Sequence, residues 1–177
     1  MFTFERVTDA NEQEAVSIYL NNQPYFSLTD DVASLQLLKQ DMVDKPESVK
    51  KENKRFFLVR KDTKPVAILD YLVDYPEEQT AYIGLLLINE KRQGHGKAIV
   101  HKLEEILLSE GMTKLALAVL LNNQPAGKFW RSLGFRPTKE TIAQMNQKKV
   151  KVLSYEKIFV HPRQGTSESI FNKQNVS

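Results

Sequence analysis

An apolar segment runs into two closely spaced glycines between residues 85 and 98, which read Leu85-Leu86-Leu87-Ile88-Asn89-Glu90-Lys91-Arg92-Gln93-Gly94-His95-Gly96-Lys97-Ala98. The apolar run is typical of a buried strand, and the apolar residues beyond Ala98 recur at helical spacing, so the glycines fall at a strand-to-helix turn. The first amides of a helix have no acceptor within the helix, and the helix dipole adds partial positive charge there. The turn therefore suits an anion such as a phosphate.

Gly94 and Gly96 alone leave two interpretations open, an anion site and a plain turn, because many strand-to-helix connections carry glycines only to turn. The segment is not a Rossmann fingerprint, since the third glycine is absent, and it lacks the Gly-Lys-Ser/Thr ending of a Walker loop. Three cations, Lys91, Arg92 and Lys97, would strengthen a positive field at this turn.

Strand and helix patterns follow one another on both sides of the turn. We expect strands at 2–6, 55–60, 66–75, 81–88, 115–121 and 150–160, with 138–142 as a candidate partner of the last. We expect a helix that ends before Pro24, a second helix that Thr29 or Asp30 caps and that stops before Pro46, and further helices at 94–109 and 125–133.

Length and composition limit the class of protein. The chain has 177 residues, and we expect one domain over residues 1–160 followed by a polar tail over 161–177. The absence of cysteine excludes disulfides, thiolate metal sites and a cysteine nucleophile, and the three histidines lack metal-ligand spacing. No apolar run approaches the roughly 20 residues of a membrane span, and the first residues do not resemble a signal peptide. We therefore expect a cytoplasmic protein with no membrane partner.

Two motifs in this order resemble those of the GNAT superfamily of acyl-CoA-dependent N-acetyltransferases. Residues 93–98 fit its Gln/Arg-x-x-Gly-x-Gly/Ala signature. Residues 123–135, Asn-Gln-Pro-Ala-Gly-Lys-Phe-Trp-Arg-Ser-Leu-Gly-Phe, are similar to its second motif, Asn-x-x-Ala, two aromatic or apolar positions and Gly-Phe. The expected order of elements over about residues 2–160 is also similar to that of the family.

The resemblance implies an α/β (α+β) fold with a mixed, mostly antiparallel sheet of about six to seven strands, flanked on both faces by about four helices. It also implies that acetyl-CoA is the acyl donor, with no metal. It places the pantetheine arm of the donor at the bulge of the fourth strand, against the backbone of Leu86, Leu87 and Ile88. It places the pyrophosphate at the amides of Gln93, Gly94, His95, Gly96, Lys97 and Ala98. The other side of the donor would be lined by Asn123 and Phe129. Asn123 can equally be a strand-end turn, and Phe129 can equally be core.

Two proton-handling side chains that are frequent in the family are missing. The tyrosine that often protonates the thiolate would stand four residues before Gly134, where this chain has Trp130, and an indole is no usable acid near neutral pH. No glutamate stands on the fourth strand, where Gly84 is the only interior residue that is not apolar.

Asp70 is our candidate catalytic residue, because aspartate is disfavoured within a strand and needs a reason there. If the hairpin between the strands at 66–75 and 81–88 turns at about residues 77–79, the numbers of two residues paired across it add up to roughly 156. Asp70 would then face Leu86, beside the expected position of the thioester. Asp70 would bind a cationic amine, act as a base with a raised pKa, or pair with a nearby lysine or arginine. A slip of one residue would move it to the other sheet face.

The function we predict is transfer of an acetyl group from acetyl-CoA to a primary amine, by direct attack in a ternary complex, with a small-molecule amine favoured over a peptide. The alternative is a domain that binds or senses CoA or acyl-CoA with little catalysis. We expect a monomer or homodimer and no nucleic-acid partner, because no basic stripe is interleaved with aromatic residues. Residues 1–50 carry a net charge of −5 and residues 51–177 carry +8, which would suit a cationic acceptor and an anionic donor.

Overall fold

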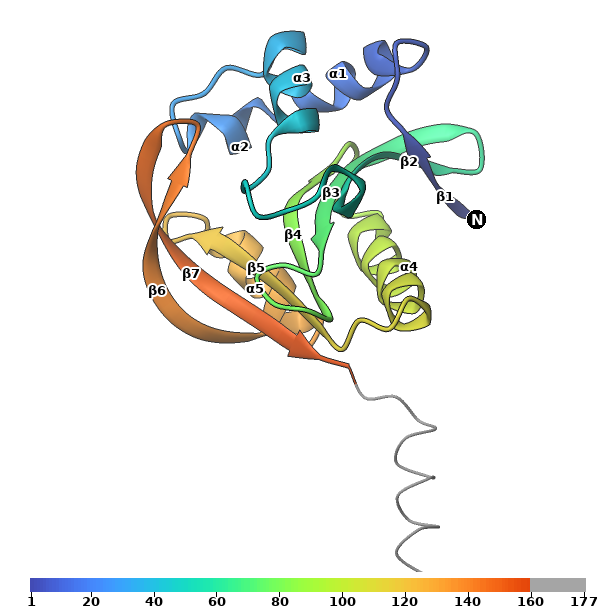
Figure 1. Cartoon of the computed structure of the whole chain (residues 1–177). Coiled ribbons are helices and arrows are strands. Elements are labelled where there is room, and N and C mark those ends of the chain that lie inside the picture. Colours follow the sequence, from blue (N-terminus) through green and yellow to red (C-terminus); the bar gives the residue numbers. More distant parts are fainter. Residues whose placement is uncertain (160–177) are drawn as a thin grey trace, which may run out of the picture.

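The computed structural model describes residues 1–159, which form one seven-stranded sheet with helices on both faces (Figure 1). The tail expected at 161–177 lies outside the described residues. The strands are β1 (Phe2–Arg6), β2 (Lys54–Lys61), β3 (Lys64–Val73), β4 (Thr80–Ile88), β5 (Lys114–Leu120), β6 (Arg136–Met145) and β7 (Lys148–Ile158). The helices are α1 (Glu12–Leu20), α2 (Gln23–Ser27), α3 (Leu35–Val43), α4 (His95–Ser109) and α5 (Gln124–Ser132), with a 3-10 turn at Lys51–Asn53.

The sheet has the strand order β1-β2-β3-β4-β5-β7-β6. All neighbouring strands are antiparallel except β4 and β5. A parallel pair needs a long crossover connection, and α4 provides it between β4 and β5. The strand-to-helix turn that begins this crossover is the glycine-bearing segment at 89–94.

Two apolar clusters cover the two faces of the sheet. α1, α2 and α3 pack on one face against Phe56, Leu58, Ile68, Leu85 and Leu87. α4 and α5 pack on the other face, against alternate residues of the same strands. Because successive side chains of a strand point to opposite faces, β3 is buried on both sides and forms the centre of the core.

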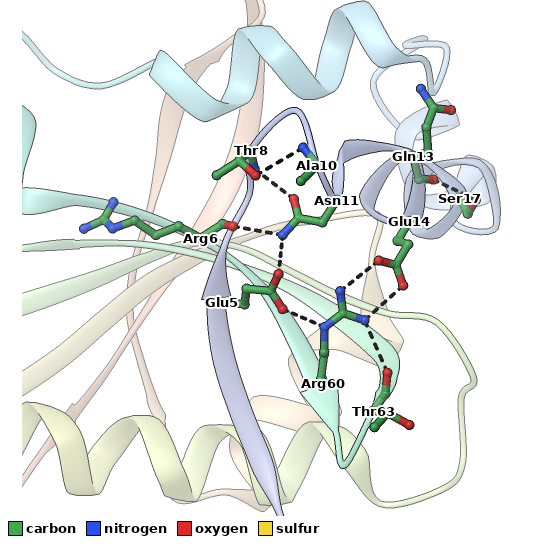
Figure 2. A network of polar contacts seen from close by, with 10 residues as sticks. All are labelled: Glu5, Arg6, Thr8, Ala10, Asn11, Gln13, Glu14, Ser17, Arg60 and Thr63. Atoms are coloured by element: carbon green, nitrogen blue, oxygen red, sulfur yellow. Dashed lines mark hydrogen bonds and ion pairs between the residues drawn. The ribbon is translucent and has the colours of Figure 1, made fainter.

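Arg60 fixes α1 to the edge of the sheet (Figure 2). Its guanidinium donates to Glu5 on β1 at 2.6 Å and to both carboxylate oxygens of Glu14 on α1 at 2.8 and 2.9 Å. The Asn11 side chain adds a hydrogen bond to Glu5 at 2.7 Å. These bonds join β1, β2 and α1 at one polar junction.

The fold class expected from the sequence is confirmed, and the expected strands and later helices occur close to their expected bounds. The expected start of the second long helix was wrong: Ser34 caps α3, its hydroxyl accepting from the Leu37 amide at 3.0 Å. The segment before it contains the unexpected short helix α2, because Pro24 stands in its first turn, where a missing N–H costs nothing.

Candidate functional site

β4 and β5 separate halfway along their length. They pair from Thr80 with Lys114 to Ile83 with Leu117, and no further pair follows within residues 1–159. β4 nevertheless stays paired with β3 up to Ile88, and β5 with β7 up to Leu120. We call the gap between Gly84–Ile88 and 118–120 the β4–β5 divergence. It leaves one backbone edge of β4 without a neighbouring strand.

The N-terminus of α4 lies at the end of this free edge. Gly94 caps the helix with a φ of 75°, a left-handed conformation that favours glycine, and no side chain caps the helix. The amides of Gln93 through Lys97 have no hydrogen-bond acceptor in the described part of the chain. The sequence-based expectation extended this set to Ala98, but the Ala98 amide already donates to the Gly94 carbonyl at 3.3 Å.

The side chains around these amides favour a negative charge. Lys91, Arg92 and Lys97 are all exposed at the turn and the first helical residues. His95 is buried instead, with its ring edge-on to Phe2 at 5.8 Å between ring centres. Its contribution to the turn is therefore made by its backbone.

The two sequence motifs meet where α5 packs on the first turn of α4. A Cβ at Gly96 would lie 3.0 Å from Cζ and 3.1 Å from Cε1 of Phe129, and 3.8 Å from Cδ1 of Ile88. Three of the predicted donor residues, Ile88, Gly96 and Phe129, are thus brought together. Phe129 is only partly buried and also packs on the core.

Asn123 caps α5, and its side-chain oxygen accepts from the Ala126 amide at 3.3 Å. This cap fixes the start of the helix that carries Phe129. Asn22, which the sequence analysis missed, donates to the Ile88 carbonyl at 3.1 Å and ties α2 to the end of β4. Nothing in its local sequence distinguishes Asn22 from other turn asparagines, so the long-range bond could not be foreseen.

The expected register of Asp70 was wrong. Asp70 pairs with Leu85 and Leu69 pairs with Leu86, while Tyr71 pairs with Ile83. Gly84 is therefore an extra residue on β4, a β-bulge. The bulge lies at Gly84 and not at Leu86–Ile88, and it puts Asp70 and Leu86 on opposite faces. Asp70 lies on the face that α1 and α3 cover, whereas Leu86 packs with the opposite cluster.

Asp70 forms a buried ion pair with Lys54 on β2. The ammonium lies 2.8 Å from Oδ2, to which it donates a hydrogen bond, and 2.7 Å from Oδ1. Burial raises the pKa of Asp70 to about 6, and Lys54 opposes that rise. Lys54 was missed because it ends a charged segment, although its alternation with Phe56 and Leu58 would have predicted an inward side chain.

A second polar pair, partly buried, joins α1 to α3. The Tyr19 hydroxyl on α1 donates to Asp41 on α3 at 2.7 Å. Burial raises the pKa of Asp41 to about 6, while the Tyr19 hydrogen bond and Lys54 lower it. Carboxylates thus gather on the sheet face that carries Asp70.

Trp130 and Tyr155 both belong to the core on the α4 and α5 side. Trp130 is 7% exposed and packs edge-on between Phe129 and Phe135, at 4.9 and 5.1 Å between ring centres. A Cβ at Gly127 would lie 3.0 Å from the Tyr155 hydroxyl. Trp130 stands where the family often has the tyrosine that protonates the thiolate, and in this chain it is a packing residue.

A surface hollow lies away from this site. It has a volume of about 370 Å³ and lies by the β3–β4 hairpin, at the opposite end of β4 from the α4 N-terminus. Neither Asp70 nor any residue predicted to bind the donor lines it. Its lining residues are Ser48, Val49, Lys50, Asn53, Asp74, Glu78 and Gln79. Among residues 1–159, no helix has the length and apolar character that a membrane crossing requires.

Several solved structures that share this fold are described as acetyltransferases. An acetyltransferase from Thermus thermophilus has a TM-score of 0.71 at 23% identity, over 90% of this chain and 97% of that chain. The ribosomal-protein-S18-alanine N-acetyltransferase from Escherichia coli has a TM-score of 0.63 at 15% identity, over 92% and 97%. A spermidine N-acetyltransferase chimera from Vibrio cholerae and hSSAT has a TM-score of 0.63 at 13% identity, over 89% and 94%.

At these identities the likeness concerns the fold, and no curated protein matches the chain in sequence. The family model described as "Acetyltransferase (GNAT) family" matches residues 16–135, which include the β4–β5 divergence, the α4 N-terminus and α5. With both motifs inside this range and more than half of the residues matched, the chain belongs to the GNAT family of acetyltransferases.

Proposed function

We propose that the protein transfers an acetyl group from acetyl-CoA to a primary amine, by direct attack in a ternary complex. The observation that carries the proposal is the juxtaposition of the free β4 edge with the unpaired amides at the start of α4. An extended amide-bearing arm can pair with a strand edge, and a pyrophosphate can bind helix N-terminal amides. Acetyl-CoA carries both groups in one molecule.

The donor would then lie along the divergence. Leu86, Leu87 and Ile88 would present backbone groups to the pantetheine arm. The amides of Gln93, Gly94, His95, Gly96 and Lys97 would hold the pyrophosphate, together with the exposed cations at the turn. Phe129 would border the other side of the donor, held in place by the Asn123 cap and by its contact with Gly96.

The acceptor would approach from the face that carries Asp70, where carboxylates favour a cationic amine. A small amine is preferred over a peptide in our proposal, because the β6–β7 turn bridges this side. Asn146 donates to Asp31 at 3.2 Å, and Lys148 donates to the Thr29 carbonyl. Such a bridge restricts an extended peptide more than a small amine.

Direct attack needs no acyl-enzyme, and a cysteine acyl-enzyme is excluded because the chain contains no cysteine. The amine nitrogen attacks the thioester carbonyl, the C–N bond forms, and the C–S bond breaks. Asp70 would take the first proton of the ammonium, and the nitrogen would lose its second proton to solvent after the attack. The CoA thiolate would take a proton from solvent, because Trp130 is not an acid at neutral pH.

The test has two parts, both on the full chain. Isothermal titration calorimetry with CoA measures donor binding. A thiol-release assay with acetyl-CoA then screens tyramine, 1,5-diaminopentane, spermidine, lysine and a peptide with a free N-terminal alanine. We expect CoA binding and amine-dependent thiol release with initial-rate lines that intersect; parallel lines would contradict the ternary complex.

A second function, CoA binding without catalysis, is favoured by one observation, the buried Trp130 at the position of the frequent acid. CoA binding with no thiol release across the panel would support that function and overturn the transferase.

A further inference from the structure

Gly84 lies at the apex of the β4–β5 divergence. It is the bulge residue that has no partner on β3, since Asp70 pairs with Leu85 and Tyr71 with Ile83. The pairing of β4 with β5 ends at the preceding residue, Ile83. Gly84 is exposed, and its φ lies outside the left-handed region, so its backbone does not itself require glycine.

The Asp70 carboxylate lies directly beneath the position of the missing side chain. A Cβ at Gly84 would come within 3.1 Å of Oδ2 and 3.7 Å of Cγ of Asp70. Asp70 itself is 8% exposed, whereas Gly84 is exposed. The carboxylate therefore approaches the divergence across a residue that has no side chain to cover it.

Lys54 is the cation of this buried carboxylate, and its ammonium also lies 5.8 Å from the centre of the Phe56 ring. Two further carboxylates, Asp41 on α3 and Asp44 at the end of α3, disfavour a second negative charge there. The neutral Tyr19 hydroxyl from α1 also faces this group. Lys54 alone among these groups favours the ionised form of Asp70.

We infer that the pair Lys54–Asp70 receives the acceptor amine across Gly84, with Gly84 as a specificity-determining gap and Lys54 as a positioning residue that keeps Asp70 ionised. This inference rests on the proposed function. The ammonium of the acceptor donates to the carboxylate and transfers one proton to it, which leaves a neutral amine. That nitrogen forms the bond to the acetyl carbon and loses its second proton to solvent, and the C–S bond breaks. The departing thiolate takes a proton from solvent, and Asp70 later releases its own proton to solvent.

The experiment measures kcat/KM for the amine that is turned over fastest in the panel, from pH 5 to pH 9, at saturating acetyl-CoA. Gly84→Ala should lower kcat/KM for the amine by about tenfold or more, since the added methyl group covers the carboxylate, and leave the calorimetric Kd for CoA unchanged. Lys54→Met should move the acidic limb of the profile upward by about one pH unit or more, because an opposite charge at this distance favours ionisation.

Two variants control the lysine experiment. Lys54→Arg keeps the charge and should restore the position of the acidic limb. Lys114→Met removes a lysine from another pair, with Glu156 at 3.6 Å, and should leave the limb in place. Lys54→Gln replaces Lys54→Met if circular dichroism shows that the methionine variant does not fold.

The outcomes separate the two proposals. If the wild type is active and Gly84→Ala is equally active, this inference is overturned and the proposed function stands. The same holds if the acidic limb of the pH profile is not shifted in a folded Lys54 variant. A wild type that binds CoA and acetylates no amine overturns both.

Discussion

Gly96 on α4 and Phe129 on α5 are in direct contact, so close that a Cβ at Gly96 would lie 3.0 Å from the ring. The contact joins the helix start that would hold the pyrophosphate to the aromatic residue that would border the other side of the donor. Such a Cβ contact is tighter than most, so the ring or the helix would have to shift slightly.

Gly96→Val should therefore weaken CoA binding about tenfold or more, because the displaced ring and the branched side chain disturb the amides of the first turn. Calorimetry with CoA measures the effect. The double variant Gly96→Ala/Phe129→Leu makes room for the smaller methyl group and should bind more tightly than Gly96→Ala alone. Equal affinity of Gly96→Val and wild type would contradict the position of the donor.

Lys97→Gln should weaken CoA binding about threefold, since one exposed cation contributes modestly in water. Lys97 is exposed in the first turn of α4, beside the amides proposed for the pyrophosphate. The loss should shrink as NaCl is raised to about 0.5 M, because salt screens the attraction. Lys139→Gln on the exposed strand β6 is the matched control and should bind CoA as the wild type does.

Asp41→Asn should become more stabilising, relative to wild type, as pH rises from 4 to 7. The folded pKa of Asp41 is raised to about 6 by burial, from an ordinary value of 3.8. A raised folded pKa contributes stability at low pH that is lost as pH rises through about 6. The asparagine cannot ionise, so the difference in unfolding free energy should grow by about 2 kcal/mol and level off above pH 7.

Urea unfolding at pH 4.5, 6.0 and 7.5 measures this difference. Tyr19→Phe is the companion variant, since the lost hydrogen bond at 2.7 Å leaves the Asp41 carboxylate without its donor. It should steepen the loss of stability with rising pH. A difference between Asp41→Asn and wild type that stays flat with pH would refute the assignment.

Arg60→Met should lower the melting temperature by about 3 °C at pH 7, because it removes the junction of β1, β2 and α1 shown in Figure 2. The hydrogen bonds from Arg60 hold the pKa values of Glu5 and Glu14 below their ordinary range. A lowered pKa contributes stability that is lost as pH falls, so the difference from wild type should shrink below about pH 4.5.

Differential scanning calorimetry checks this prediction. Lys64→Met removes the exposed pair with Glu90 and should change the melting temperature much less. A difference between Arg60→Met and wild type that persists at pH 3 would show that Arg60 acts through packing and not through its carboxylate partners.

Local patterns predicted most of the fold. The apolar run ending at Ile88, the glycines at 94 and 96 and the helical spacing beyond Ala98 correctly placed β4, the turn and α4. The first helix does end before Pro24, as predicted, but the short helix α2 that contains Pro24 was not foreseen. A proline can also stand in the first turn of a new helix, so it does not show that no helix follows.

Register was the part of the site that local patterns could not provide. Near the turn Tyr71 pairs with Ile83, a register that without a bulge would pair Asp70 with Gly84. The bulge makes Leu85 the partner of Asp70 instead, so that Leu86, the expected partner, lies on the other face. In a strand that is apolar on both faces, an extra residue barely changes the pattern of polar and apolar residues. The sequence around Gly84 therefore gives no signal that marks the bulge. Lys54 was missed because it stands at the end of a charged segment, although the alternation of β2 marks it as inward; its partner Asp70, 16 positions away, could not be read from the local sequence.

The most direct test of the central claim follows the acetyl group itself. The full chain is incubated with acetyl-CoA that carries a deuterated acetyl group and with the amine panel, and mass spectrometry identifies the products. Our account predicts that the label appears on the nitrogen of an amine, in step with the release of CoA thiol, and that Gly96→Val slows both. Release of labelled acetate with no labelled amine, or no consumption of acetyl-CoA by a protein that binds it, would contradict the account.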